Sequence, residues 1–177
     1  GITGIGLLSG SGVITKNGAG AAAIIAAAGY SGGLILNNGI FVVDASIPNS
    51  TVSINGTAPM GTLALSGFGG TGTVGATTVT SGVISAGTLT SPTGILNISN
   101  GLTFTANGAY VCKIGGTAPG TNGHDQLNVT GAVNLGNALL APIPWGGFQP
   151  AVNDTFVILR NDGTDAVNGT FLGMPEG

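Results

Sequence analysis

Charged side chains are the scarcest feature of this sequence. The 177 residues include three Lys or Arg and six Asp or Glu, so 5% of the chain is charged, whereas an average soluble domain carries about 25%. With a net charge of −3, the chain lacks the basic residues that give affinity for a nucleic-acid backbone. Six scattered acids also argue against a polysaccharide lyase or hydrolase, because such enzymes need carboxylates paired in a groove. The composition predicts a protein that is not an enzyme, needs no cofactor and binds no nucleic acid.

Cysteine and long apolar runs are also scarce. Cys112 is the single cysteine, which excludes an intramolecular disulfide. It shares one face of a predicted strand with Tyr110 and Ile114, so we expect a small buried side chain, with a reactive thiol or an intermolecular bridge as the alternative. The most apolar run, Ala19–Ala28, is about half of the ~20 residues that a membrane-spanning helix needs. This run favours a buried strand, although its alanines also suit a short helix over one end of the fold.

Glycine is abundant, at 35 positions, and apolar residues between the glycines alternate with Thr, Ser and Asn. Successive side chains of a strand point to opposite faces, so this pattern predicts strands with one apolar and one polar face. The clearest alternating pairs are Leu96/Ile98, Leu102/Phe104 and Leu127/Val129. Asn-Gly occurs seven times, and both residues tolerate the positive φ of tight turns. Several turns recur at similar intervals, as from Asn38-Gly39 to Asn55-Gly56, and this spacing leaves room for short strands only.

Two all-β architectures fit these patterns, namely an antiparallel sandwich and a parallel β-solenoid. The solenoid is favoured because uncharged Asn and Thr side chains can stack in ladders between coils and because glycine permits sharp corners. Similar segments at a fixed spacing also indicate a repeat fold. Coils of ~20 residues stacked ~4.8 Å apart would give about eight coils in a rod on the order of 40 Å long. We therefore predict a single-domain parallel β-helix.

The last third of the sequence differs from the rest. Prolines at 142, 144 and 150 interrupt the pattern, and proline disturbs regular coils. We expect residues 1–124 to form the solenoid repeat region. Residues 125–177 are expected to close the same domain as a β cap, with short and partly antiparallel strands.

The segment Gly10–Val43, GSGVITKNGAGAAAIIAAAGYSGGLILNNGIFVV, resembles the autotransporter-associated β-strand repeat. The resemblance lies in a glycine-rich opening with Lys16, a Tyr30-Ser-Gly-Gly33 turn and an Asn37-Asn-Gly39 turn between strands. Segments 69–87, 115–140 and 146–177 are similar to parts of the same family that follow such an opening. The resemblance implies a secreted bacterial surface protein with a β-helical passenger, an extracellular location, and a structural or adhesive role without catalytic residues.

Three chemical motifs have plainer interpretations. Gly70–Gly75 matches GxGxxG, but no helix pattern or suitably placed acid follows, so turn glycines are expected rather than a dinucleotide site. His124 and Asp125 are neighbours whose side chains would point apart, which favours a hydrogen-bonded loop histidine and a turn-capping Asp over a catalytic triad. Asn161–Asp165 resembles part of a calcium loop but lacks the late glutamate, so a polar turn is favoured over a Ca²⁺ site.

Aromatic residues could stack on sugar rings, and Tyr30, Tyr110 and Trp145 are the candidates. Trp145 lies between Pro144 and Gly146 in a predicted loop and is the best candidate for an exposed glycan contact. The favoured interpretation, however, is that it covers the open end of the core.

The leading functional hypothesis is a structural subunit of a cell-surface fibre or layer. The end of a solenoid presents unpaired backbone groups and apolar core, so copies could join head to tail into a homopolymer, or a terminal segment could add as a strand to a neighbour. The expected contact residues near the N-terminal end are Ile2, Ile5, Leu7, Leu8 and Val13. The alternative is an adhesin or passenger domain that binds a host or glycan surface as a monomeric rod.

Overall fold

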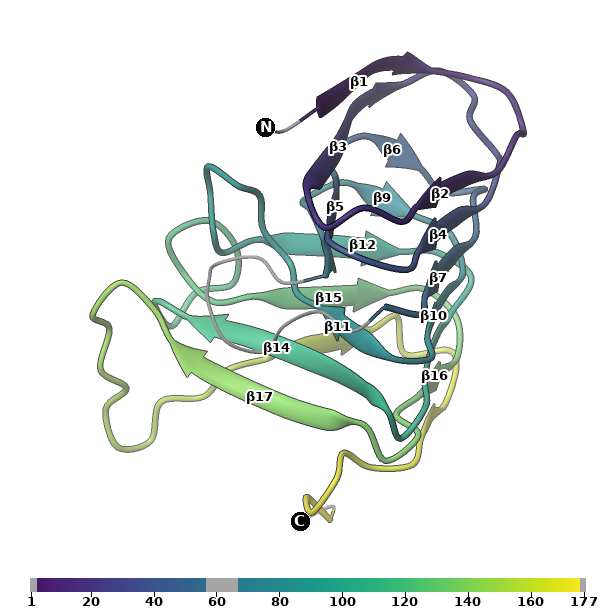
Figure 1. The fold of residues 1–177 in the computed structure, drawn as a ribbon. Helices are drawn as coiled ribbons and strands as arrows, with labels where there is room; N and C mark the ends of the chain where they lie inside the picture. The colour runs from purple at the N-terminus through teal and green to yellow at the C-terminus, as the bar shows by residue number, and fades with distance from the viewer. Residues whose placement is uncertain (1–2, 57–66, 176–177) are drawn as a thin grey trace.

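The chain forms an all-β fold of three sheets of parallel strands. The computed structural model describes residues 3–56 and 67–175, and these contain no helix. Figure 1 shows the backbone winding from one sheet to the next in stacked coils. The predicted arrangement of parallel strands is therefore confirmed, and the antiparallel sandwich kept as an alternative is wrong.

The three sheets have the following members in spatial order. Sheet A consists of β1 (Thr3–Leu8), β3 (Ala21–Ala27), β5 (Ile40–Val43), β8 (Phe68–Gly69), β11 (Gly82–Ile84), β14 (Gly108–Ile114) and β17 (Leu139–Pro144). Sheet B consists of β2 (Ile14–Lys16), β4 (Leu34–Leu36), β7 (Val52–Ile54), β10 (Thr77–Val79), β13 (Leu102–Phe104), β16 (Val133–Asn134) and β19 (Val167–Asn168). Sheet C consists of β6 (Ser46–Ile47), β9 (Thr73–Val74), β12 (Ile95–Ile98), β15 (Gln126–Val129) and β18 (Leu159–Asn161).

Coil length increases along the chain, as the register of sheet B shows. In the early coils Ile14 pairs with Leu34, which in turn pairs with Val52. Near the other end Leu102 pairs with Val133 and Val133 with Val167, so each of these coils takes up a longer stretch of sequence. Sheets A and B contain seven strands each within the described residues, compared with the eight coils expected, because the later coils contain longer links.

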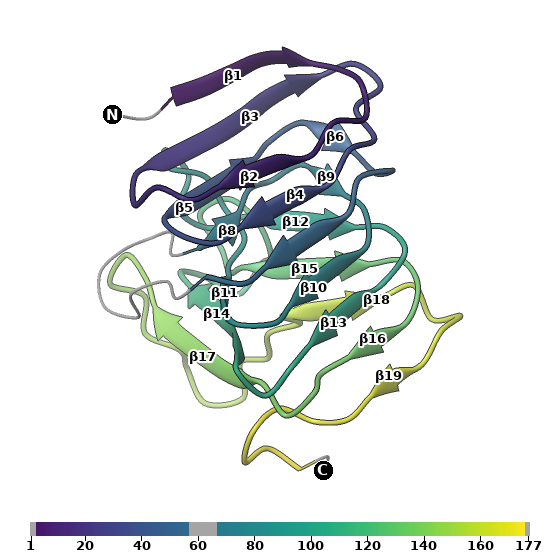
Figure 2. The same ribbon diagram turned by 45° about the vertical axis from the view of Figure 1, so that its right-hand side comes forward.

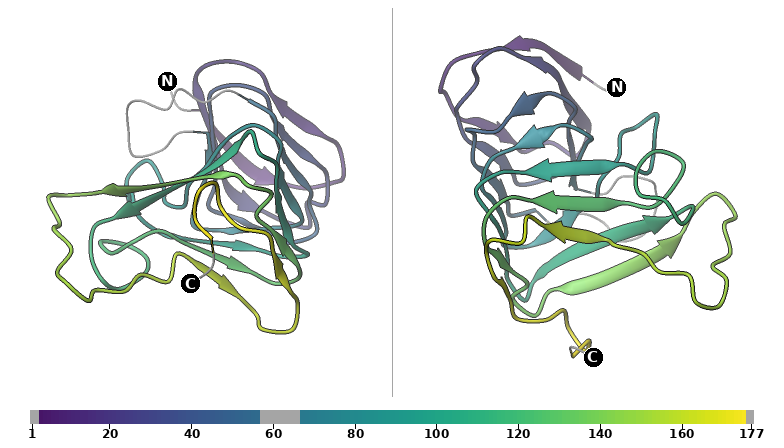
Figure 3. Two further views of the ribbon diagram at one scale, coloured as in Figure 1. Left: turned by 90° about the horizontal axis from the view of Figure 1, so that it is seen from below. Right: turned by 180° about the vertical axis from the view of Figure 1, so that it is seen from behind.

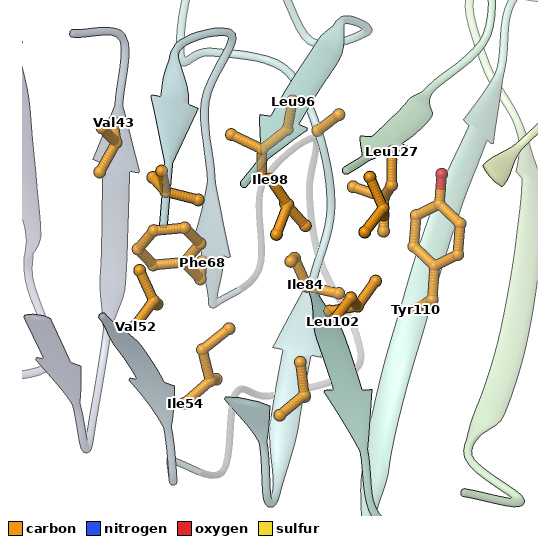
Figure 4. Packing of buried hydrophobic residues seen from close by; sticks show 14 of the residues in the cluster. Val43, Val52, Ile54, Phe68, Ile84, Leu96, Ile98, Leu102, Tyr110 and Leu127 are labelled. Atoms are coloured by element: carbon orange, nitrogen blue, oxygen red, sulfur yellow. The ribbon is translucent and has the colours of Figure 1, made fainter. Parts of the chain in front are cut away.

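The core fills the space enclosed by the three sheets. Phe41, Phe68, Ile84 and Tyr110 lie in register on successive strands of sheet A, and each is at most 1% exposed. Figure 4 shows three members of this column, Phe68, Ile84 and Tyr110, beside side chains from sheets B and C that include Ile54, Leu96 and Ile98. The two phenylalanine rings meet edge to face at 6.1 Å, one of the geometries that aromatic pairs prefer.

Polar side chains stack on the outside, as the sequence predicts. Asn37 donates its side-chain N–H to Asn17 Oδ1 at 2.8 Å on the coil before. Asn128 donates in the same way to Asn97 Oδ1 at 3.2 Å on sheet C. Stacking at one-coil spacing places identical amides within hydrogen-bond reach without charge repulsion.

The glycines of the GxGxxG match are required by close coil stacking. A Cβ on Gly70 would lie 2.0 Å from Val43 O, on Gly72 2.1 Å from Ala45 O, and on Gly75 1.8 Å from Ser50 O. Gly70 and Gly72 precede β9 and Gly75 follows it. At these positions the chain lies directly against backbone carbonyl groups of the preceding coil. The motif therefore has a packing explanation, in agreement with its interpretation as turn glycines.

The alanine-rich run forms a strand. Within Ala19–Ala28, β3 occupies Ala21–Ala27 and pairs in parallel with both β1 and β5. Small side chains suit this site because Ala22 lies in register with Phe41. The helical alternative is wrong, since pairing on both edges satisfies the backbone and outweighs the helix propensity of alanine.

The C-terminal third continues the solenoid. β15, β16, β17, β18 and β19 all pair in parallel with the coil before them. In residues 125–175 the predicted antiparallel closure is represented by one isolated bridge, between Phe171 and Met174. Pro142 and Pro144 lie inside β17 rather than breaking it, which is possible because β17 is the outermost strand of its sheet.

Candidate functional site

Three long links of the solenoid gather at the corner between sheets A and C. β5 and β8 are followed by links of residues 44–45 and 70–72, whereas β11, β14 and β17 are followed by residues 85–94, 115–125 and 145–158. Figures 2 and 3 show the later links extending beyond the outline of the earlier coils. Binding and catalytic residues concentrate on loops that a rigid scaffold carries. This corner is therefore the candidate functional site.

A buried ion pair lies beneath these links. Lys113 Nζ is 2.5 Å from Asp125 Oδ2, and the two side chains are 2% and 0% exposed. Lys113 comes from β14 and Asp125 precedes β15, and the link between them is held by Asp125 N–H donating to Lys113 O at 2.9 Å. Lys113 Nζ also donates to Ser85 Oγ and, at 3.0 Å, to Ala86 O.

The carboxylate of Asp125 has partners on both oxygens. Gly94 N–H donates to Oδ1 at 3.1 Å, and Lys113 N–H donates to Oδ2 at the same distance. Ser85 Oγ lies 3.3 Å from Oδ2 and donates to it. Both ends of the 85–94 link and strand β14 therefore converge on one carboxyl group.

Burial works against both charges of the pair. It lowers the pKa of Lys113 and raises the pKa of Asp125, and in each case the opposite charge of the partner opposes the shift. Breaking such a pair by removing one partner leaves a buried charge without compensation, which is more costly than losing an exposed ion pair. The stability of this corner therefore depends on both partners being present.

His124 lies beside the pair but faces another way. Its side chain is 1% exposed, its Nδ1 lies 3.2 Å from Gly116 O, and its ring meets Phe156 edge to face at 5.4 Å. Its Nε2 has no hydrogen-bond partner among the described residues. The expected hydrogen-bonded histidine is thus found at Nδ1 but not at Nε2. The Asp125 carboxylate accepts the N–H of Lys113 across the 115–125 link, and the two side chains contact different neighbours.

A groove made of adjoining hollows runs over the outer face of sheet C and is crossed by a row of polar side chains. Asn97, Asn128 and Arg160 lie in register on successive strands, while Leu96 and Ile98 beside Asn97 belong to the core. Three hollows of about 340, 390 and 490 Å³ adjoin this row and are lined in part by its side chains. Asn128 Oδ1 is buried with no partner in the described part of the chain. Around the hollows lie hydroxyl and acidic groups, namely Thr71, Ser99, Thr117, Thr121, Thr130, Thr155 and Asp162.

The structure places the predicted assembly residues at the N-terminal end, with one exception. Ile2 lies outside the described residues, and Ile5 is in β1, paired with Ile24. Leu7 is 72% and Val13 63% exposed. Leu8 is half-buried and packs against the core.

The three aromatic candidates differ in accessibility. Tyr30 is buried and donates its hydroxyl to Gly12 O at 2.7 Å and Gly33 O at 3.1 Å, and Tyr110 is fully buried with its hydroxyl donating to Ile158 O at 2.9 Å. Neither ring can stack on an external sugar, so that part of the expectation is wrong. Trp145 is half-buried and continues the backbone pairing of β17 through its N–H, which donates to Ile114 O.

Cys112 is buried in the core, as expected. Burial, and then the charge of Asp125, raise its pKa to about 12. The thiolate is the reactive form, so this thiol is unreactive at neutral pH.

The Asn161–Asp165 segment forms a hydrogen-bonded turn. Asp162 Oδ1 accepts from Thr164 N–H at 3.1 Å and from Thr164 Oγ1 at 3.0 Å. These bonds lower the pKa of Asp162. Within residues 3–56 and 67–175, no three His, Cys, Asp or Glu side chains are grouped as ligands of a metal ion.

Sequence reasoning missed the ion pair between Lys113 and Asp125. A signal was present, because Lys113 is the single charged residue of an otherwise apolar strand and Asp125 is the single acid between Asp44 and Asp154. The register that brings the two together depends on the path of the 115–125 link, which the pattern of residues does not specify.

Comparison with known proteins yields no relative: no family model, curated protein or solved structure matches the chain. The resemblance to the autotransporter-associated repeat therefore stays a prediction. Among the described residues there is no helix whose length and hydropathy would let it cross a membrane.

Proposed function

We propose that this protein is a non-enzymatic structural rod of the bacterial cell surface that associates through the N-terminal end of its solenoid. The location rests on the sequence resemblance to secreted surface proteins. The mode of association rests on one observation, which is that the two ends of the solenoid differ in how their edge strands are protected.

Among the described residues, the N-terminal edge of sheet A lacks the features that protect the opposite edge. β1 is the outermost strand of sheet A and contains six residues without proline or charge. Beside it, Leu7, Val13 and Ile25 are more than 60% exposed. A long, uncharged edge strand with apolar neighbours is a template for pairing with another chain.

The C-terminal end is protected by its prolines. Pro142 and Pro144 pair in register with Cys112 and Ile114. In a parallel pair, alternate residues of one strand, here Cys112 and Ile114 of β14, form their backbone hydrogen bonds with the residues of β17 that flank their register partners. The register partners themselves, here the two prolines, therefore direct their nitrogens, which carry no hydrogen, toward the free edge. Phe171 also covers this end, with its ring 6.1 Å from that of Phe104.

These differences favour pairing between two N-terminal ends. A head-to-tail homopolymer would require β1 of one copy to pair with β17 of the next, where two of the donors are missing. Two copies that meet through β1 would instead form an isologous dimer with a protected end on each side. The proposed product is a rod of double length rather than an open-ended filament.

Replacing Leu7 by lysine tests this association. We expect the wild-type chain to sediment as a dimer and Leu7→Lys as a monomer, because lysine on an edge strand opposes pairing. Leu172→Lys is the matched control, since Leu172 is 53% exposed near the protected end, and this variant should remain dimeric. A wild-type chain that is monomeric at every concentration would refute the association, and filaments in electron micrographs would restore the head-to-tail hypothesis.

A second candidate function is glycan binding in the groove over sheet C. The observation that favours it is the groove itself, where the exposed guanidinium of Arg160 lies at the end of the Asn97–Asn128 amide stack and hydroxyl groups line the hollows. The guanidinium and these hydroxyls can hydrogen-bond an extended polysaccharide. Affinity electrophoresis in gels containing hydroxyethyl cellulose or polygalacturonate provides the measurement.

We expect retardation of the wild-type chain and its loss in Arg160→Ala. Asn37→Ala, in the amide stack outside this groove, should migrate like the wild type. Equal migration of all three proteins with and without polysaccharide would contradict the second candidate.

A further inference from the structure

We propose that Lys113 and Asp125 become covalently joined by an isopeptide bond between Lys113 Nζ and the Asp125 side-chain carbon. The proposal is independent of how the rod associates. It rests on the arrangement of four groups at the corner between sheets A and C: the amine, the carboxyl, the Ser85 hydroxyl and the Gly94 amide.

The first observation is the position of the two reacting groups. Lys113 Nζ and Asp125 Oδ2 are 2.5 Å apart, and both side chains are almost completely excluded from solvent. Reacting groups held in contact by a folded scaffold gain the large rate advantage of an intramolecular reaction. Exclusion of water also disfavours the reverse reaction, in which water would cleave the amide.

The second observation is that burial promotes the reactive form of each group. An uncharged amine is the nucleophile and an uncharged carboxyl is the electrophile. Desolvation disfavours the charged form of both groups, in contrast to an exposed ion pair, where each side chain stays charged and unreactive.

The reaction balances without an added reactant. The lone pair of Nζ attacks the carboxyl carbon of Asp125, the C–N bond forms, and the bond from that carbon to Oδ2 breaks. The amine gives up two protons in total, counted from its ammonium form, and both leave with Oδ2 as one molecule of water. The products are a neutral secondary amide and water.

Ser85 and Gly94 are placed to assist these steps. Lys113 Nζ donates to Ser85 Oγ, and Ser85 Oγ donates to Asp125 Oδ2 at 3.3 Å. The hydroxyl can therefore accept a proton from the amine and pass another to the leaving oxygen. Gly94 N–H donates to Oδ1 at 3.1 Å, where negative charge develops when the carboxyl carbon becomes tetrahedral.

The mass of the intact protein tests the bond. We expect the folded wild-type chain to be lighter than its sequence by one water molecule. Asp125→Ala and Lys113→Ala should each have the full mass of their sequences, whereas Lys16→Ala should still be one water lighter. A wild-type mass equal to the full sequence mass would overturn the proposal and leave a simple buried ion pair.

Tryptic digestion of the denatured wild-type chain gives a second measurement that does not depend on the folding of any variant. The cleavage sites follow Lys16, Lys113 and Arg160. An acylated Lys113 resists trypsin, so the linked chain should yield residues 17–160 as one peptide. Separate peptides 17–113 and 114–160 would refute the bond.

A Ser85→Ala variant tests the proton relay specifically. It retains the amine and the carboxyl but lacks the hydroxyl between them, so we expect a mixture in which the full-mass species predominates soon after folding. Complete loss of water in this variant at the wild-type rate would exclude Ser85 from the reaction.

Discussion

In chains that keep the full mass of their sequence, where Lys113 and Asp125 form an ion pair rather than an amide, replacing Lys113 by alanine is expected to lower the free energy of unfolding by about 3–5 kcal/mol. This is the cost of removing one partner from a buried ion pair. Asp125 is fully buried, and Lys113 supplies its one ion-pair partner within the described residues. In the variant, the Gly94 N–H and Ser85 hydroxyl remain near the carboxylate but carry no net charge. Urea denaturation of the two proteins measures the difference.

The loss of stability in Lys113→Ala is expected to increase with pH, because Asp125 becomes charged as pH rises. Burial raises the pKa of Asp125 above its ordinary value of 3.8, and Lys113 opposes this rise, so the pKa in the variant is higher still. A group whose folded-state pKa is raised stabilises the fold below its unfolded pKa and loses that contribution as pH rises through the folded value. The variant should therefore lose more stability at pH 7 than near pH 4. Equal losses at both values would contradict this explanation.

Two further variants separate the ion pair from general effects of substitution. Lys16→Ala removes an exposed ammonium that contacts the carbonyl oxygens of Gly18 and Asn38, and its effect should stay within about 0.5 kcal/mol. The double variant Lys113→Met with Asp125→Leu should be milder than either single replacement by alanine, because it leaves no buried charge unpaired. A double variant as unstable as the sum of the singles would refute the coupling.

Replacing Gly75 by alanine is expected to lower the free energy of unfolding by about 3 kcal/mol, at the upper end of the usual range for overpacking. An added Cβ would lie 1.8 Å from Ser50 O and 2.8 Å from Pro48 O. Both atoms belong to the backbone of the preceding coil, which cannot retreat without disturbing the pairing of β6 and β9. Thermal and urea denaturation provide the measurement.

Gly20→Ala is the matched control for Gly75→Ala. Neither glycine has a positive φ, and a Cβ on Gly20 would meet no atom within 4 Å. The two replacements change the unfolded chain in the same way, so their difference reports the close approach of the coils. If both variants are as stable as the wild type, the coils do not stack as closely as described.

The order of strands along the chain was largely accessible from the sequence. Alternation at Leu96/Ile98 and Leu127/Val129 predicts strands with one buried face, and these residues are in the core. The preference for stacked coils followed from uncharged Asn and Thr, whose side chains can lie above one another, and the Asn97–Asn128 hydrogen bond confirms such stacking. Both inferences rest on local rules that relate a residue to its own strand or to an identical neighbour.

The end of the chain shows where such rules fail. Pro142 and Pro144 suggested broken coils, yet they lie in a regular strand because no further strand pairs with β17 in the described structure. Whether a proline is tolerated depends on the side to which its nitrogen points, and that is fixed by the partner strand rather than by the proline itself.

The sequence by itself determined the class of fold. The alternation of apolar and polar residues and the scarcity of charge are local features, and each segment shows them without reference to the rest of the chain. Only the tertiary structure decided which of the few charged residues meet. Lys113 and Asp125 are brought together by the path of a long link at one corner of the solenoid, and Asn97, Asn128 and Arg160 by the register between coils. Contacts of this kind join residues that are distant in sequence, and they depend on how the coils stack and where the links run. The candidate site could therefore be identified only from the tertiary structure.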